Sequence, residues 1–354
     1  MSEEAKTSGR LISIFGTPSG YLRFASLLLH NMLATTVKNF DHVAASELQH
    51  LRAALSKRRH PNFLLLSDCP ERSIVDVYLN TQTPVLVVFE DPEDVATDLI
   101  RERGIEPTWA VRYTEQSLTT LDDLIRSDQA LIMPRERRIM LADFLIQVAE
   151  HFSLPLADAD LEIIARKVAP KTQDALTMSM EDLYQLNLIN LNPNGQSAFN
   201  PQVLAPFEPI FERLRRLLNS QTDSEINWPI FMLMEGDAPK STFDGSLDLT
   251  GPARCIVYGP YMCLPYGSWG LRASITINEN RSGNELEIDV YQSSVLVRNR
   301  FPLPLEGDLE IRAQFKNSEP RVPLQLRLIT AEGAIEGRIT VNSITLIKLE
   351  DLSE

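Results

Sequence analysis

The hydrophobic period of the chain changes part way along, and this change restricts the folds that the chain can adopt. Up to about residue 110, short apolar runs bounded by turn residues alternate with segments whose apolar residues recur every three or four positions. Near-continuous apolar strands that alternate with helices are typical of a parallel α/β sheet covered on both faces. The expected strands are 10–15, 62–67 and 84–89, and the expected helices are 21–35, 43–57, 71–80 and 94–103.

A wholly helical pattern follows from residue 121 to 219, where apolar residues again lie three and four apart. The polar stretch Asn219–Glu225 has the composition of a linker. Because 354 residues exceed what one hydrophobic core usually serves, we expect more than one domain. The predicted divisions are a disordered tail at 1–9, an α/β domain at 10–120, its helical extension at 121–219, a linker at 220–230 and a second domain at 231–354.

The second domain has the period of strands. Its segments alternate apolar with polar residues and are separated by Gly, Pro and Asn turns, which predicts an antiparallel, jelly-roll-like β-sandwich. The expected strands are 254–258, 269–277, 284–291, 294–298, 309–315, 324–329 and 337–348.

Charge and cysteine content narrow the classes of function. A net charge of −14 argues against a protein that binds nucleic acid or anionic membranes through a basic face. The three cysteines lack metal-site spacing and the even number of a disulfide framework, and the start of the chain lacks a signal-peptide pattern, so we expect a cytoplasmic protein without membrane insertion. The five histidines lack ligand spacing, and no metal is predicted.

The stretch from Val85 to Ile100 resembles a strand-to-helix turn of the P-loop sulfotransferases, in which an Arg and a Ser hold the 3′-phosphate of phosphoadenosine phosphosulfate. This chain has Glu90 and Asp98 at those two positions. Two carboxylates repel a phosphate dianion by about 1 to 4 kcal/mol per pair at a few ångströms. The resemblance therefore predicts a retained frame with a lost donor site, and no cofactor.

An earlier turn resembles the phosphosulfate loop of the same family, Lys-Ser-Gly-Thr-Thr before a helix. Gly16 lies in this turn, and Ser19 and Gly20 match the motif, while Pro18, Tyr21 and Leu22 replace the Lys and the two Thr residues. Arg23 either replaces part of the lost charge or is a solvated helix residue. The family uses a catalytic base near the acceptor, for which Asp68 is the candidate; the alternative for Asp68 is a turn residue before Pro70.

The segment 257–270 resembles the Gly-Pro-Tyr and Leu-Pro-x-Gly signature of carbohydrate-binding-like sandwich modules in bacterial surface-polysaccharide biosynthesis proteins. Exposed aromatic side chains there could stack on a sugar ring, or they could instead fill the sandwich core. The candidate sugar-binding residues are Tyr258, Tyr261, Tyr266 and Trp269, with Asp289, Arg298 and Arg300 as possible hydrogen-bonding partners.

Three functions are compatible with these patterns. The first is a non-catalytic sulfotransferase-like protein that helps to assemble or regulate bacterial cell-surface polysaccharide biosynthesis, with glycans or synthesis proteins as partners. The second is an active glycan-modifying transferase with a rebuilt donor site. The third is an interaction scaffold that binds proteins or self-associates through sheet edges. We favour the first because Pro18, Glu90 and Asp98 together replace three donor contacts.

Overall fold

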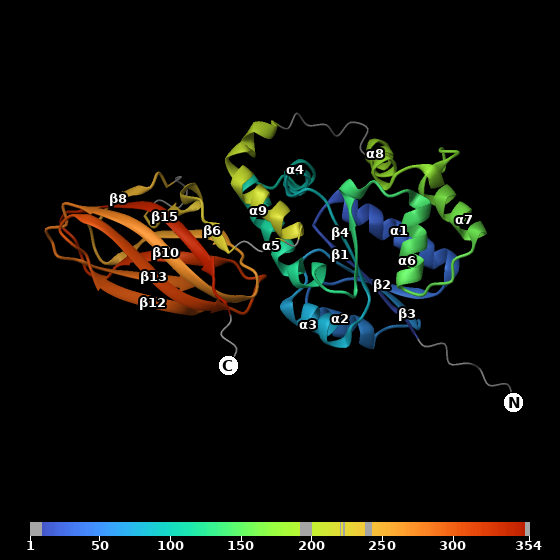
Figure 1. Ribbon diagram of the computed structural model, residues 1–354, viewed down its shortest axis with the longest axis horizontal. Helices are drawn as coiled ribbons and strands as arrows, with labels where there is room; N and C mark the ends of the chain where they lie inside the picture. Colours follow the sequence, from blue (N-terminus) through green and yellow to red (C-terminus); the bar gives the residue numbers. More distant parts are fainter. Residues whose placement is uncertain (1–8, 192–199, 220, 222–223, 238–242, 351–354) are drawn as a thin grey trace. The chain divides into compact units, whose positions relative to one another are not determined.

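The computed structural model describes residues 9–191, 200–219, 221, 224–237 and 243–350, with only the backbone of residues 188–191. The chain divides into two compact units, Met1–Ser220 and Gln221–Glu354. The predicted tail at 1–9 lies outside the described residues except for Gly9, and so do three residues of the predicted linker, 220, 222 and 223. Figure 1 shows the elements of each unit along the chain.

The first unit is built on a five-stranded parallel sheet with the order β2-β3-β1-β4-β5, as the α/β prediction requires. Its strands are β1 (Leu11–Gly16), β2 (Phe40–Ala44), β3 (Asn62–Ser67), β4 (Val85–Phe89) and β5 (Ala130–Pro134). The helices are α1 (Gly20–Thr36), α2 (Leu48–Ser56), α3 (Arg72–Thr81), α4 (Pro92–Arg103), α5 (Pro107–Ile125), α6 (Leu141–His151), α7 (Asp158–Val168), α8 (Met180–Leu191) and α9 (Glu208–Leu218). Short 3-10 turns are η1 (Arg135–Arg137), η2 (Ala175–Thr177), η3 (Pro201–Val203) and η4 (Ala205–Phe207).

Two hydrophobic clusters cover the two faces of this sheet. One joins Ile12 and Ile14 of β1 to apolar residues of α1, α6, α7 and α8. The other joins Phe15 of β1 to residues of α2, α3 and α5. The central strands are therefore buried on both sides, which accounts for their continuous apolar sequences.

Two strands of the sheet differ from the predictions. Phe40–Ala44 forms edge strand β2, so the helix expected over 43–57 is wrong at its start and α2 begins at Leu48. Ala130–Pro134 forms the other edge strand, β5, inside the stretch predicted to be wholly helical. Strand β2 includes Asp41 and His42 and so lacks the apolar run that marks the central strands, whereas β5 is apolar but lies in a stretch whose surrounding pattern is helical.

The second unit is an antiparallel β-sandwich, as predicted, and all seven expected strands are present. One sheet has the order β13-β10-β15-β6 with β8 also paired to β15, and the other has the order β12-β11-β14-β9-β7. The bounds are β6 (Glu225–Asn227), η5 (Ile230–Met232), β7 (Met234–Glu235), β8 (Ser246–Asp248), β9 (Arg254–Met262), β10 (Gly267–Asn278), β11 (Glu285–Tyr291), β12 (Val295–Pro302), β13 (Gly307–Asn317), β14 (Leu324–Thr330) and β15 (Arg338–Lys348).

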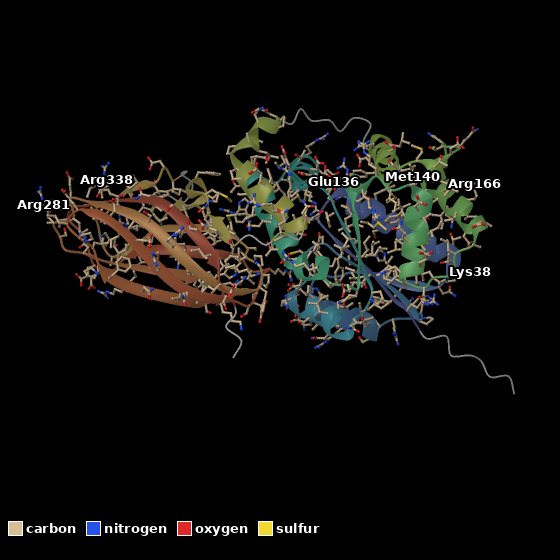
Figure 2. The ribbon with its side chains drawn as sticks, in the orientation of Figure 1. Lys38, Glu136, Met140, Arg166, Arg281 and Arg338 are labelled. Atoms are coloured by element: carbon tan, nitrogen blue, oxygen red, sulfur yellow. The ribbon has the colours of Figure 1, made fainter. Side chains whose placement is uncertain are left out.

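Alternate residues of the long strands fill the space between the two sheets. Leu271, Ala273 and Ile275 of β10 are buried, as are Leu286 and Ile288 of β11. The intervening residues are polar, which is the alternation that the sequence pattern predicts. Figure 2 adds the side chains and labels residues at the ends of elements, such as Lys38 after α1 and Arg338 at the start of β15.

Candidate functional site

The turn between β1 and α1 is the part of the first unit that could cradle an anion. Ser19 is the N-cap of α1, and its hydroxyl accepts a hydrogen bond from the backbone N–H of Leu22 at 3.3 Å. A Cβ atom on Gly16 would lie 2.3 Å from the carbonyl oxygen of Val88, so only glycine allows β1 to approach β4 this closely. The turn thus presents the N-terminus of a 17-residue helix, where backbone N–H groups and the helix dipole favour negative charge.

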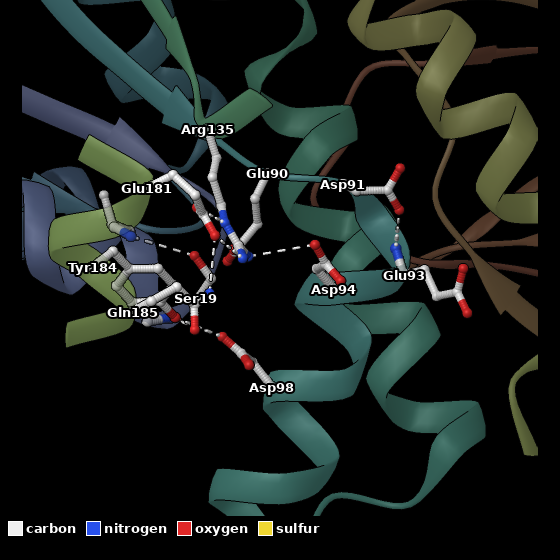
Figure 3. Close-up of polar contacts among 12 residues, drawn as sticks. Ser19, Glu90, Asp91, Glu93, Asp94, Asp98, Arg135, Glu181, Tyr184 and Gln185 are labelled. Atoms are coloured by element: carbon white, nitrogen blue, oxygen red, sulfur yellow. Dashed lines mark hydrogen bonds and ion pairs between the residues drawn. The ribbon is translucent and has the colours of Figure 1, made fainter. Parts of the chain in front are cut away.

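A carboxylate of the protein itself occupies this helix N-terminus. Asp98 of α4 accepts a hydrogen bond from the backbone N–H of Gly20 at 3.3 Å and another from the hydroxyl of Tyr184 of α8, also at 3.3 Å. Figure 3 shows Asp98 below Tyr184, with Ser19 between Tyr184 and α4. A Cβ atom on Gly20 would lie 2.2 Å from the Tyr184 hydroxyl oxygen, so the tyrosine closes directly over the glycine. The N–H that an external anion would use is therefore engaged internally.

Glu90, the second predicted phosphate position, is held by an arginine. Its carboxylate is fully buried after β4, and its Oε2 lies 2.6 Å from a guanidinium nitrogen of Arg135. Arg135 also donates to Glu181 of α8, at 2.8 Å for one of the two bonds, and its guanidinium lies 5.1 Å from the ring centroid of Tyr184. Glu90 therefore has a cationic partner, Arg135, which the sequence analysis did not predict.

Burial is the main influence on the pKa values of the two carboxyl groups in this cluster. Burial raises the pKa of Glu90 to about 7; the Ser19 hydroxyl and Arg135 act in the opposite direction, and the nearby charge of Asp98 adds to the increase. Burial also raises the pKa of Asp98, which the hydrogen bonds from Gly20 and Tyr184 partly offset. One oxygen of Glu90, Oε1, has no hydrogen-bonding partner among the described residues.

The remaining predicted residues of this region do not join the cluster. Arg23 forms an ion pair with Glu102 of α4 and is about half exposed. Asp68 accepts a hydrogen bond from the Ser46 hydroxyl at 3.4 Å, and its backbone carbonyl accepts one from Ser117. These contacts match a turn residue that ties β3 to neighbouring segments, and among the described residues no hydrogen bond joins Asp68 to Asp98 or Glu90.

Arg135, Tyr184 and Glu181 are the members of the cluster that sequence reasoning missed. Arg135 directly follows β5, so recognition of that edge strand would have placed it at the carboxyl edge of the sheet beside Glu90. Nothing in the local sequence around Tyr184 distinguishes it from an ordinary helical core residue.

In the sandwich, a row of polar side chains crosses the outer face of the β12-β11-β14-β9-β7 sheet. Strand register pairs Tyr258 with Arg327, Arg327 with Asp289, and Asp289 with Arg298. Both oxygens of Asp289 lie 2.7 Å from Arg327, and Arg298 donates to Oδ2 at 2.8 Å. The guanidinium of Arg327 lies 4.2 Å from the ring centroid of Tyr291. Arg327 and Tyr291 were not predicted, although the parity of β11 places Tyr291 on the same face as Asp289.

The four predicted sugar-binding aromatics divide into different environments. Tyr258 and Tyr261 of β9 are half-buried, with ring centroids 6.1 Å apart in an edge-to-face arrangement. Tyr266, before β10, is 38% exposed and lies 5.8 Å from the Lys316 ammonium. Trp269 is 1% exposed, and its indole N–H donates to the carbonyl of Pro265. We therefore correct the predicted set: Trp269 is a core residue and offers no stacking face.

The described residues form no group of three or more metal-ligating side chains, and no helix among them is long and apolar enough to cross a bilayer. Arg300, the third predicted hydrogen-bonding residue, pairs with Glu285 at the end of β12.

Comparisons with known proteins give similarities of fold. No protein-family model matches the chain, and no curated protein matches it. Among solved structures, a mouse sulfotransferase, SULT7A1, complexed with PAP is 12% identical and is matched over 61% of this chain and 90% of its own, with a TM-score of 0.38. The xylan-binding module CBM15 is 13% identical over 36% of this chain and 99% of its own, with a TM-score of 0.29. The C-terminal CBM6 of LamC from Zobellia galactanivorans is 11% identical over 36% and 90%, with a TM-score of 0.19.

Proposed function

We propose that this protein is a non-catalytic, sulfotransferase-like protein with a glycan-binding sandwich, and that it acts as an assembly or regulatory component of bacterial cell-surface polysaccharide biosynthesis. The observation that carries the non-catalytic part is the hydrogen bond from the Gly20 N–H to Asp98. The polysaccharide context rests on the resemblance of segment 257–270 to sandwich modules of such proteins.

A nucleotide phosphate at the β1–α1 turn would have to displace the side chain of Asp98. It would remove the bonds of Asp98 to Gly20 and Tyr184, and it would place a dianion near Glu90. Hydrogen bonds to charged groups contribute about 1.5 to 3 kcal/mol each. This chain lacks the Lys, Arg and Ser contacts of the family, and a bound nucleotide would also break internal hydrogen bonds, so we expect its affinity to be very low.

The glycan-binding part is supported by the outer face of the β12-β11-β14-β9-β7 sheet. The half-buried Tyr258 lies next to the Arg327–Asp289 pair in the strand register, so an aromatic side chain and fixed hydrogen-bonding groups share one face. Aromatic rings suit the C–H faces of sugars, and the paired charges suit their hydroxyl groups. Because Arg298 pairs with Glu287 as well as Asp289, and Arg327 pairs with Asp289, two arginines are matched by two carboxylates, and this face suits a neutral glycan better than an acidic one.

Two measurements on the full-length chain test the proposal. In calorimetric titration with phosphoadenosine phosphate we expect no binding, and micromolar affinity would instead support a transferase with a rebuilt donor site. In glycan-array binding we expect a signal that Tyr258→Ala removes and Tyr113→Ala retains, since Tyr113 is an exposed tyrosine of α5 in the other unit. A folded protein that binds no glycan would favour the interaction scaffold instead.

A further inference from the structure

A groove beside edge strand β2 is separate from the site described above. It has a volume of about 390 Å³ and is lined by Arg23, Ser26, Leu27 and His30 of α1, His42 of β2 and Leu66 of β3. Arg23, Leu27 and His30 recur at four- and three-residue spacing, so they lie along one face of α1. The 46% exposure of Leu27 shows that the described residues leave this face partly uncovered.

The chemistry of the groove differs from that of the protein as a whole. Three of its six lining residues are basic and none is acidic, in a chain with a net charge of −14. The rings of His30 and His42 lie 5.9 Å apart between centroids, and His30 also packs edge-to-face on Phe40. The carboxylate that faces this set is Glu102 of α4, which pairs with Arg23 at the rim.

We propose that this groove binds a small organic anion, namely a compact ring that carries a carboxylate or phosphate group. Arg23, the two imidazoles and the Ser26 hydroxyl supply donors to the anionic group, while Leu27 and Leu66 contact the apolar body of the ligand. The volume matches the lower part of the range of small-molecule sites, about 300 to 1,000 Å³. This site does not depend on the proposed function, because none of its six lining residues belongs to the Asp98 cluster or the sandwich.

Anion binding to this groove should be coupled to proton uptake by its histidines. Burial and the nearby charge of His30 lower the pKa of His42, so the empty groove disfavours two protonated imidazoles. A bound anion reverses this effect, since it stabilises His30 and His42 in their charged forms. Binding therefore takes up protons and strengthens as pH falls from about 8 to about 6. A metal ion bound by the two imidazoles would instead release protons.

The test uses the full-length protein with glucuronate and glucose 6-phosphate as probes and glucose as the neutral control. Proton NMR of the five histidines, assigned with His30→Gln and His42→Gln, is expected to show chemical-shift changes for the His30 and His42 rings on addition of either anion and no change for His50, whose side chain is 71% exposed on α2. Calorimetry in buffers of different ionisation enthalpy should show proton uptake, and His42→Gln should weaken binding about tenfold.

The matched control His50→Gln should bind as the wild type does, and its circular dichroism and that of the two groove variants should be unchanged because none of the three imidazoles belongs to a hydrophobic cluster of this unit. A response to one probe alone identifies whether the carboxylate or the phosphate is the preferred group. The proposal is wrong if neither anion shifts His30 and His42, if glucose binds equally well, if folded His42→Gln binds unchanged, or if Zn²⁺ alone binds there with proton release.

Discussion

The carboxylate of Asp98 lies 3.3 Å from the backbone nitrogen of Gly20, at the helix N-terminus where a P-loop-type turn would hold a phosphate. An internal side chain here satisfies the same N–H and the same helix dipole that an external anion would use. The sequence shows an acid where the resembled motif has a serine. The structure shows that this acid accepts a hydrogen bond from the turn itself, in addition to repelling an external anion.

Replacement of Asp98 tests how much this contact stabilises the first unit. Asp98→Ala leaves the Gly20 N–H and the Tyr184 hydroxyl without their acceptor, and we expect a loss of about 1 to 3 kcal/mol in the free energy of unfolding. Urea unfolding followed by circular dichroism at 222 nm reports on this unit, because all described α-helices belong to it. Asp94→Ala is the control, since Asp94 is 56% exposed and lies 3.4 Å from Arg135; it should change stability by less than about 0.5 kcal/mol. Equal effects of the two variants would contradict this role of Asp98.

Glu90 should make the stability of this unit depend on pH. The folded protein keeps a proton on Glu90 up to a pKa of about 7, whereas the ordinary value is 4.5, so between these pH values the native state binds more protons than the unfolded state. Stability from this group is therefore present below about pH 4.5 and is lost as pH rises through 7, by roughly 3 kcal/mol.

Glu90→Gln removes this titration. Compared with wild type, the variant should gain relative stability between about pH 5 and pH 8, as measured by urea unfolding at each pH. Glu136→Gln, on the exposed turn η1, should show no such trend. A stability difference between wild type and Glu90→Gln that stays constant over this range would show that Glu90 is ionised throughout.

Arg135 should be the most sensitive residue of the cluster. Arg135→Leu leaves Glu90 buried without a cation and removes both bonds to Glu181, so we expect a loss of about 3 to 5 kcal/mol near pH 8 and a smaller loss near pH 5, where Glu90 takes up a proton. Arg137→Leu, two residues away and exposed, should change stability by less than about 0.5 kcal/mol. A loss at Arg135 as small as that at Arg137 would show that the ion pairs contribute nothing net.

Asp289 should have the corresponding role in the sandwich. It is 1% exposed although it lies on the outer face of its sheet, because Arg298 and Arg327 close over it. Asp289→Ala should destabilise the sandwich by about 2 to 4 kcal/mol, measured during urea unfolding in a Trp109→Phe background by the fluorescence of Trp228 and Trp269, the two tryptophans of this unit. Glu310→Ala removes an exposed pair with Arg312 on β13 and serves as the control. If both variants unfold at the wild-type urea midpoint, the ion pairs of Asp289 with Arg298 and Arg327 do not contribute to the stability of the sandwich.

The parts of the fold that were predictable are those where burial dictates the pattern. The central strands β1, β3 and β4 are mainly apolar because helices cover both faces of the sheet. The strands of the sandwich alternate apolar with polar residues because one face of each sheet is exposed to solvent. Edge strand β2 contains exposed residues such as His42, and the five apolar residues of β5 are only partly buried apart from Met133, so the same reasoning could not separate these strands from helices or loops.

Only those residues of the candidate site that lie within a local sequence motif could be predicted. Glu90 and Asp98 are visible in the sequence because they replace residues of a resembled motif. Arg135 is 45 residues from Glu90, and its position depends on pairing of β4 with an edge strand that has no strong sequence signal. Trp269 shows the converse limit: its signature motif is visible, but strand parity alone decides that its ring is buried.

The central claim, that the protein's own carboxylate fills the donor site, is tested most directly by a crystal structure of the full-length chain soaked with phosphoadenosine phosphate at millimolar concentration. We predict that the bond from the Gly20 N–H to Asp98 and the pair of Glu90 with Arg135 remain in place and that no nucleotide occupies the turn. A nucleotide whose phosphate accepts from Gly20, with Asp98 and Tyr184 displaced, would contradict the account.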